Sequence, residues 1–181
     1  MTTGVLNYPR RPLSERERTI REALSRFASS STTAAGALTV VHTTADQTFN
    51  SSTVANVTDL SFIVANGTYS HFRFFLIVRN SSVTEGAKFT LTLPAVTRFA
   101  ARAFAILGNN GAVTTWEDTI LSSGDVVVTV NFPVVNTDYP IIIEGAIVPA
   151  ADGSVQLQAG NESGIGTVTV RQGSCGILTG L

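Results

Sequence analysis

The chain has 181 residues, of which 44% are hydrophobic and 14% are charged, and its formal net charge at pH 7 is −1. This length fits one domain with a short appendage. The charged fraction lies below the roughly 25% of ordinary soluble domains, so we expect part of the surface to be covered by other protein. Cys175 is the only cysteine, which excludes an intrachain disulfide and a cysteine-based zinc site.

Residues 1–36 are predicted to form an extension, here called the arm, on a domain that covers 37–181. The arm lacks the apolar stretch of a signal peptide, so we expect the protein to be made in a cytoplasm. Its first 28 residues contain six arginines and three glutamates, a net charge of +3, whereas the rest of the chain carries −4. A basic extension on a mildly acidic body predicts docking on an acidic partner.

A short amphipathic helix is predicted inside the arm, over about 14–28. Ser14 and Glu17 have the three-residue spacing of a capping box, and apolar residues follow at spacings of four and three. Six arm side chains form the candidate docking surface: Arg10, Arg11, Arg16, Ile20, Leu24 and Phe27. The alternative is that the helix packs on its own domain, because about four turns with one narrow stripe are marginal in water alone. The small residues of 29–36, "SSSTTAAG", then predict a linker.

From residue 37 onward, nearly every segment alternates like a β-strand. The clearest segments are 58–65, 71–80, 88–94, 102–108, 125–132, 139–148, 154–159 and 167–172. Turn signals such as "GNNG", "SSGD" and "AADG" separate them. No apolar run approaches the roughly 20 residues that span a bilayer, so no membrane partner is expected. About eight short strands predict an all-β domain, a single antiparallel jelly-roll sandwich or barrel, with an immunoglobulin-like sandwich as the alternative.

Several of these segments have a clear apolar face. Three such faces are Phe72, Phe74, Leu76 and Val78; Phe104 and Ile106; and Val126, Val128, Val130 and Phe132. The segments 71–80 and 139–148 are apolar on both faces, which exceeds what one core requires. Four residues are therefore predicted to contribute to a subunit interface or to the core: Phe75, Ile77, Ile142 and Leu157. The sequence does not separate these two fates.

No catalytic constellation is evident, so we expect no enzyme, no cofactor and no metal site. His42 and His71 are the only histidines, and no G-x-S-x-G motif occurs. A small buried thiol near the final strand is favoured for Cys175 over a nucleophile paired with a histidine. Glu117 and Asp118 are interpreted as turn residues. Nucleic acid is not an expected partner, because each phosphate contact requires a cation and the arm carries a net charge of only +3.

The carboxy-terminal part carries a resemblance to a known group of proteins. A strand ends at Gly145, a turn follows at Asp152 and Gly153, a strand runs through 156–161, and a Gly-Ser step precedes the last strand at 173–174. In this arrangement, residues 115–181 resemble the carboxy-terminal half of a group of tailed-bacteriophage virion proteins. A weaker likeness covers "LSFIVANGTYSHFRFFLIVRN". The chain departs from the group in having Ala159 where an aromatic is common, and Cys175 after the Gly-Ser step.

The resemblance implies a jelly-roll module, often trimeric, on the head, tail or fibres of a virion, without enzymatic residues. We therefore predict a capsid decoration, or cement, protein at the virion head surface. Its expected partners are the major capsid protein of the same virion and, in a homotrimer, further copies of the chain. One alternative is a tail or head-fibre module that binds host glycans or proteins, for which Trp116 or Tyr69 could serve. Another is the shell-forming jelly-roll coat protein of a small virus.

Overall fold

The structure is a computed structural model, and it describes residues 38–109 and 112–180. The helix and the linker predicted in the arm lie outside these residues. The described part of the chain forms twelve strands and no helix. The strands are β1 (Leu38–His42), β2 (Gln47–Phe49), β3 (Ala55–Val64), β4 (Ser70–Asn80), β5 (Ala87–Thr92), β6 (Val96–Asn109), β7 (Ala112–Ile120), β8 (Val127–Val128), β9 (Asp138–Pro149), β10 (Gly153–Asn161), β11 (Val168–Val170) and β12 (Cys175–Gly180).

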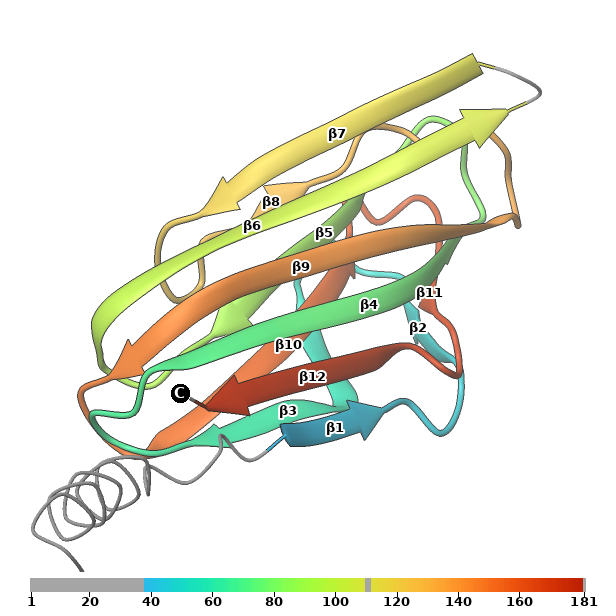
Figure 1. Ribbon diagram of the computed structural model, residues 1–181. Coiled ribbons are helices and arrows are strands. Elements are labelled where there is room, and N and C mark those ends of the chain that lie inside the picture. The colour runs from blue at the N-terminus through green and yellow to red at the C-terminus, as the bar shows by residue number, and fades with distance from the viewer. Residues whose placement is uncertain (1–37, 110–111, 181) are drawn as a thin grey trace, which may run out of the picture. The chain divides into compact units, whose positions relative to one another are not determined.

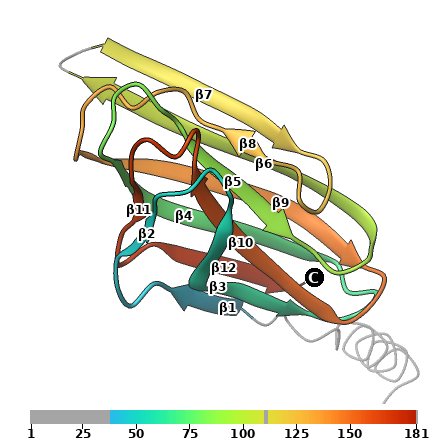
Figure 2. The same ribbon diagram turned by 180° about the vertical axis from the view of Figure 1, so that it is seen from behind.

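The strands form two antiparallel sheets that pack face to face (Figures 1 and 2). The larger sheet has the order β1-β12-β4-β9-β6-β7. The short strand β11 pairs with β4 on one side and with β2 on the other, which joins both to this sheet. The smaller sheet has the order β3-β10-β5-β8. Figure 1 shows the larger sheet in front and Figure 2 shows the smaller one. The all-β, antiparallel architecture predicted from the alternating segments is therefore confirmed for the described residues.

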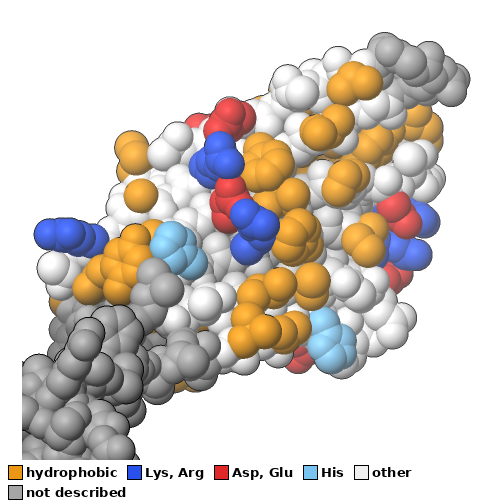
Figure 3. All heavy atoms as spheres, in the orientation of Figure 1, with side chains coloured by type: hydrophobic (Ala, Val, Ile, Leu, Met, Phe, Trp, Pro, Cys, Tyr) orange, Lys and Arg blue, Asp and Glu red, His pale blue; other side chains and the backbone are white. Residues whose placement is uncertain are grey.

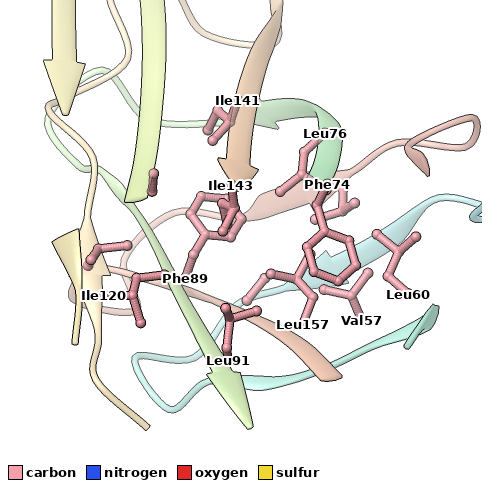
Figure 4. Packing of buried hydrophobic residues seen from close by; sticks show 14 of the residues in the cluster. Val57, Leu60, Phe74, Leu76, Phe89, Leu91, Ile120, Ile141, Ile143 and Leu157 are labelled. Carbon is pink, nitrogen blue, oxygen red and sulfur yellow. The ribbon is translucent and has the colours of Figure 1, made fainter. Parts of the chain in front are cut away.

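The core fills the space between the two sheets (Figure 4). The larger sheet contributes Phe74, Leu76, Ile141 and Ile143, and the smaller one contributes Phe89, Leu91 and Leu157. Phe62 and Phe74 stack across the interior with ring centroids 5.0 Å apart. Side chains of alternate residues point to one face of a strand, and the apolar face predicted at Phe72, Phe74, Leu76 and Val78 is the buried one.

The apolar face predicted within 102–108 is not the one that is buried. Phe104 is half-buried and Ile106 is exposed on the outside of the larger sheet, whereas Ala103 and its small neighbours point inward. The reason lies in β9, because Ala103 is the cross-strand partner of the fully buried Ile143. Bulky side chains on β9 occupy the interior, and small residues on β6 fit beside them.

Two further sequence interpretations need correction. The prediction of one strand over 125–132 with one apolar face is wrong, because β8 pairs with β5 for only two residues and the chain then leaves the sheet. As a result Val127 and Phe132 are buried, while Val126 and Val130 are exposed.

The interpretation of Glu117 and Asp118 as turn residues is also wrong, because both lie within strand β7. Their cross-strand partners are Phe104 and Ala103 respectively. The two carboxylates therefore point to opposite faces of the sheet, and they do not form a paired acidic site.

Candidate interaction face

The side of the larger sheet that points away from the core, here called the outer face, carries the candidate site. Its apolar row crosses four strands: Cys175 on β12, Phe75 on β4, Ile142 on β9 and Phe104 on β6 are successive cross-strand partners. Phe75 is 37% exposed, and the nearby Ile77 and Ile106 are 39% and 55% exposed. Figure 3 shows hydrophobic side chains gathered over these strands.

A charged row runs beside the apolar row across the middle of the outer face (Figure 3). Register places Arg73 and Arg102 on either side of Glu144. Arg73 Nε donates to Glu144 Oε2 at 2.6 Å, and a terminal guanidinium nitrogen of Arg102 donates to Oε1 at 2.7 Å. Arg102 also reaches Glu117 Oε1 at 3.3 Å. Glu144 therefore accepts from an arginine on each of its two carboxylate oxygens.

The charges in this row stabilise one another. The hydrogen bonds from Arg102 hold the pKa of Glu144 below its ordinary value, in spite of the raising effect of burial, and Arg73 lowers it further. The same carboxylate raises the pKa of Arg102. The two guanidinium carbons lie 5.5 Å and 5.3 Å from the ring centroids of Phe75 and Phe104. Charged and apolar rows thus pack against each other within cation–π distance.

On the other side of the charged row the outer face is hollowed. The hollow measures about 620 Å³. It is bordered by the charged row and by Phe75 and Ile177 beside it, and its far side is formed by His71, Ala100, Ala146 and Thr179. Gly145 lines the hollow only with its backbone, because its side-chain position points inward like those of its cross-strand partners Phe72 and Ala101. Small side chains in this part of the sheet therefore leave room for a group that projects from a partner.

The structure separates the four residues predicted to lie at a subunit interface or in the core. Phe75, Ile77 and Ile142 lie together on the outer face, whereas Leu157 is fully buried between the sheets. The arm residues of the predicted docking surface lie outside the described residues. Sequence reasoning missed Phe104 and the charged row as parts of the face. For Phe104 the available signal was the alternation in β6, once its inward side is recognised as the alanine side; for the charged row local sequence holds no signal.

Cys175 and His42 are neighbours across β12 and β1 on the outer face. The predicted buried thiol is not observed: Cys175 is half-buried, on the outer face at the start of β12. Within residues 38–109 and 112–180 no group of three or more His, Cys, Asp or Glu side chains could hold a metal ion. The described residues also contain no helix long and apolar enough to cross a membrane.

The Gly-Ser step that precedes β12 has a structural role. Gly173 has a φ of +87°, in the region that glycine adopts most readily. Ser174 Oγ then accepts a hydrogen bond from the Ile77 amide at 3.0 Å and donates to the Arg171 carbonyl at 2.8 Å. This turn fixes where β12 begins beside β4, and so it sets the register of the apolar row.

No protein-family model and no curated protein matches the chain. Three solved structures with a distant likeness come from infectious bursal disease virus. They are the VP2 subviral particle (10% identity, TM-score 0.22), the Gt strain (11%, 0.18) and the Gx strain (12%, 0.19). Each match covers 80% of this chain but only 40%, 37% and 40% of the other. At these TM-scores the likeness is too distant to carry a function from one chain to another.

Proposed function

We propose that the chain is a non-enzymatic structural protein of a virion, a capsid decoration protein that sits on the head surface and is attached through its arm. The observation that carries this proposal is the outer face, where an apolar row and an internally neutralised charged row offer a surface for protein contact. Large exposed apolar patches that are rimmed by polar residues mark protein–protein contact sites. The sparse charge of the whole chain supports the same conclusion.

The strand order supports a jelly roll as the form of the domain. The four-stranded sets β1-β12-β4-β9 and β3-β10-β5-β8 face each other, and most consecutive strands lie in opposite sheets. The hairpin of β6 and β7 is inserted between β5 and β8 and extends the larger sheet beyond β9. Two facing four-stranded sheets with such crossings are the jelly-roll arrangement of many viral shell domains.

The arm is proposed to bind the major capsid protein of the same virion. Its arginines would meet carboxylates on the shell bidentately, and its apolar stripe would cover apolar shell surface. Many identical copies on one shell would turn weak contacts into firm attachment. The expected clustering of copies, as a homotrimer or another oligomer, would add to this effect.

The direct test is co-sedimentation of the full chain with shells of the virus that encodes it. A triple variant with Arg10→Glu, Arg11→Glu and Arg16→Glu should lose shell binding and keep its circular dichroism spectrum. Lys88→Glu, on β5 of the smaller sheet, reverses one charge away from both the arm and the outer face and should bind like the wild type. Unchanged binding by the triple variant would refute docking through the arm.

Light scattering with ultraviolet absorbance separates the alternatives. A small oligomer without nucleic acid supports a decoration or fibre role, and binding to host cells rather than shells would favour the fibre module. Megadalton particles that contain nucleic acid would instead identify a shell-forming coat protein.

A further inference from the structure

We propose that the outer face of the larger sheet is closed by the same face of a second copy of this chain, in a two-fold pair. The inference rests on the proposed function, because it names the contact through which copies of a virion protein cluster. It also goes beyond that function, since a face that meets itself specifies a pair rather than the trimer that the resemblance implies.

The shape of the outer face supports this pair. Along β4, the outward residues run His71, Arg73, Phe75 and Ile77, and along β6 they run Ala100, Arg102, Phe104 and Ile106. Both strands therefore pass from the hollow, through the charged row, to a ridge of large apolar side chains. The ridge comprises Phe75, Ile77, Ile142, Phe104 and Ile106.

A two-fold axis that lies in the contact plane and crosses the strands between the charged and apolar rows brings complementary parts together. It places the ridge of each copy over the hollow of the other, twice by symmetry. On β6 this sets Ile106 over the partner's Ala100, and on β4 it sets Ile77 over the partner's His71, beside the small Ala146. The same operation sets each charged row against the partner's apolar row.

The charges of the outer face also permit its burial. Burial of a charge is costly unless it is paired, and here the pairing is complete before any partner arrives. Glu144 is held by two arginines, and its side chain is only 16% exposed. The row of Arg73, Glu144, Arg102 and Glu117 has no net charge, so a second copy can cover it without leaving a lone charge. Each guanidinium already lies over an aromatic ring and would stack on the partner's ring as well.

The area of the outer face is sufficient for such a contact. Six strands at a spacing of about 4.8 Å, with strands of about ten residues at 3.3 Å each, give a face on the order of 950 Å². A stable interface of standard size buries about 800 Å² per partner. The outer face is therefore large enough for one full isologous contact and needs no other surface.

The experiment measures the mass of the full chain by light scattering over a range of concentrations. We expect twice the chain mass for the wild type, and at least tenfold weaker association for Ile77→Glu, because the contact would then have to bury a carboxylate in place of an apolar side chain. The matched control is Ile63→Glu, since Ile63 is 80% exposed on the other sheet; this variant should pair like the wild type. Circular dichroism verifies that both variants are folded.

Thiol reactivity gives a second readout. Cys175 lies at the end of the apolar row, so the pair should slow its reaction with a maleimide. Ile77→Glu should restore fast reaction, and Ile63→Glu should not. A monomer at high concentration, or an oligomer whose mass and thiol reactivity are unchanged by Ile77→Glu, would overturn the pair. A wild-type trimer would overturn it as well.

Failure of the pair and failure of the virion role remain distinguishable. If the pair is absent but the full chain binds shells through its arm, the two-fold contact is wrong and the decoration role stands. If the pair forms and no shell is bound, the contact stands and the decoration role is wrong.

Discussion

The inner and outer faces of the larger sheet are both rich in large apolar side chains, but they hold them differently. On the inner face, Phe74 is fully buried and stacks on Phe62. On the outer face, Phe75 lies under the guanidinium of Arg73 and keeps over a third of its surface exposed. The inner face is covered by the smaller sheet of the same chain. The outer face points away from that sheet, and its charged side chains neutralise one another. Apolar character alone therefore does not identify the core.

The largest expected effect comes from truncating the inner face. Phe74→Ala should lower the free energy of unfolding by about 3–5 kcal/mol, because it removes a fully buried ring and leaves a cavity. Phe75→Ala is the matched change one residue away, and in the monomer it should cost less than about 1 kcal/mol. Urea unfolding at low protein concentration measures both. Similar losses for the two variants would contradict the assignment of the faces.

A buried carboxylate should show the next largest effect. Glu85 is buried; it accepts a hydrogen bond from the Ser163 hydroxyl on one oxygen and one from the Gly166 amide, at 3.2 Å, on the other. In Glu85→Gln one of these donors would face an NH₂ group. We expect a loss of about 1.5–3 kcal/mol at pH 7, the range for hydrogen bonds to charged groups, measured by urea unfolding.

The same residue predicts a pH dependence with a definite sign. The hydrogen bond from Ser163 is the main cause that holds the pKa of Glu85 below its ordinary value, in spite of burial. Because the folded pKa is lower than the unfolded one, the stabilisation is complete above the unfolded pKa and is lost as the pH falls through the folded value. Stability of the wild type should therefore fall on acidification, and Glu85→Gln should show a smaller fall. Identical acid profiles would argue against this role.

A methyl group added on the inner side of β9 should cause the third largest loss of stability. In Gly145→Ala the new Cβ would lie 2.7 Å from the Cβ of Ala101 and closer still to a backbone oxygen, so the strands must shift. We expect a cost of about 1–3 kcal/mol from overpacking. Ala146→Val adds more bulk on the outer side, where the hollow accepts it, and should cost less. Thermal unfolding of the monomer compares the two.

The sequence predicts the strands well where the alternation is strict and is marked by charge. In β4, two arginines label the outer face and four apolar residues label the inner one, so the orientation can be assigned without a structure. In β6, the larger side chains lie outside, because the isoleucines of β9 already fill the interior. Orientation there depends on a neighbouring strand rather than on the segment itself.

The charged row could not be predicted from local sequence at all. Arg73 and Glu144 are 71 positions apart, and Arg102 is 42 positions from Glu144. They meet only because the sheet order places β4 and β6 on either side of β9. The order of strands in the sheet is set by the packing of both sheets, so it cannot be predicted from the pattern of one segment at a time.

The smallest expected effect lies at the end of the charged row. Glu117→Gln removes the contact with Arg102, but both side chains are more than half exposed, and exposed ion pairs contribute little to stability. Arg102 keeps Glu144 as its main partner, so we expect no measurable change in unfolding of the monomer, at low or high salt. Glu144→Gln is the contrasting change, because it removes the negative charge between two arginines and turns an NH₂ group toward one of them. If the two variants unfold alike, the row is a set of independent surface charges; if only Glu144→Gln is destabilised, Glu144 is the centre that makes this face neutral.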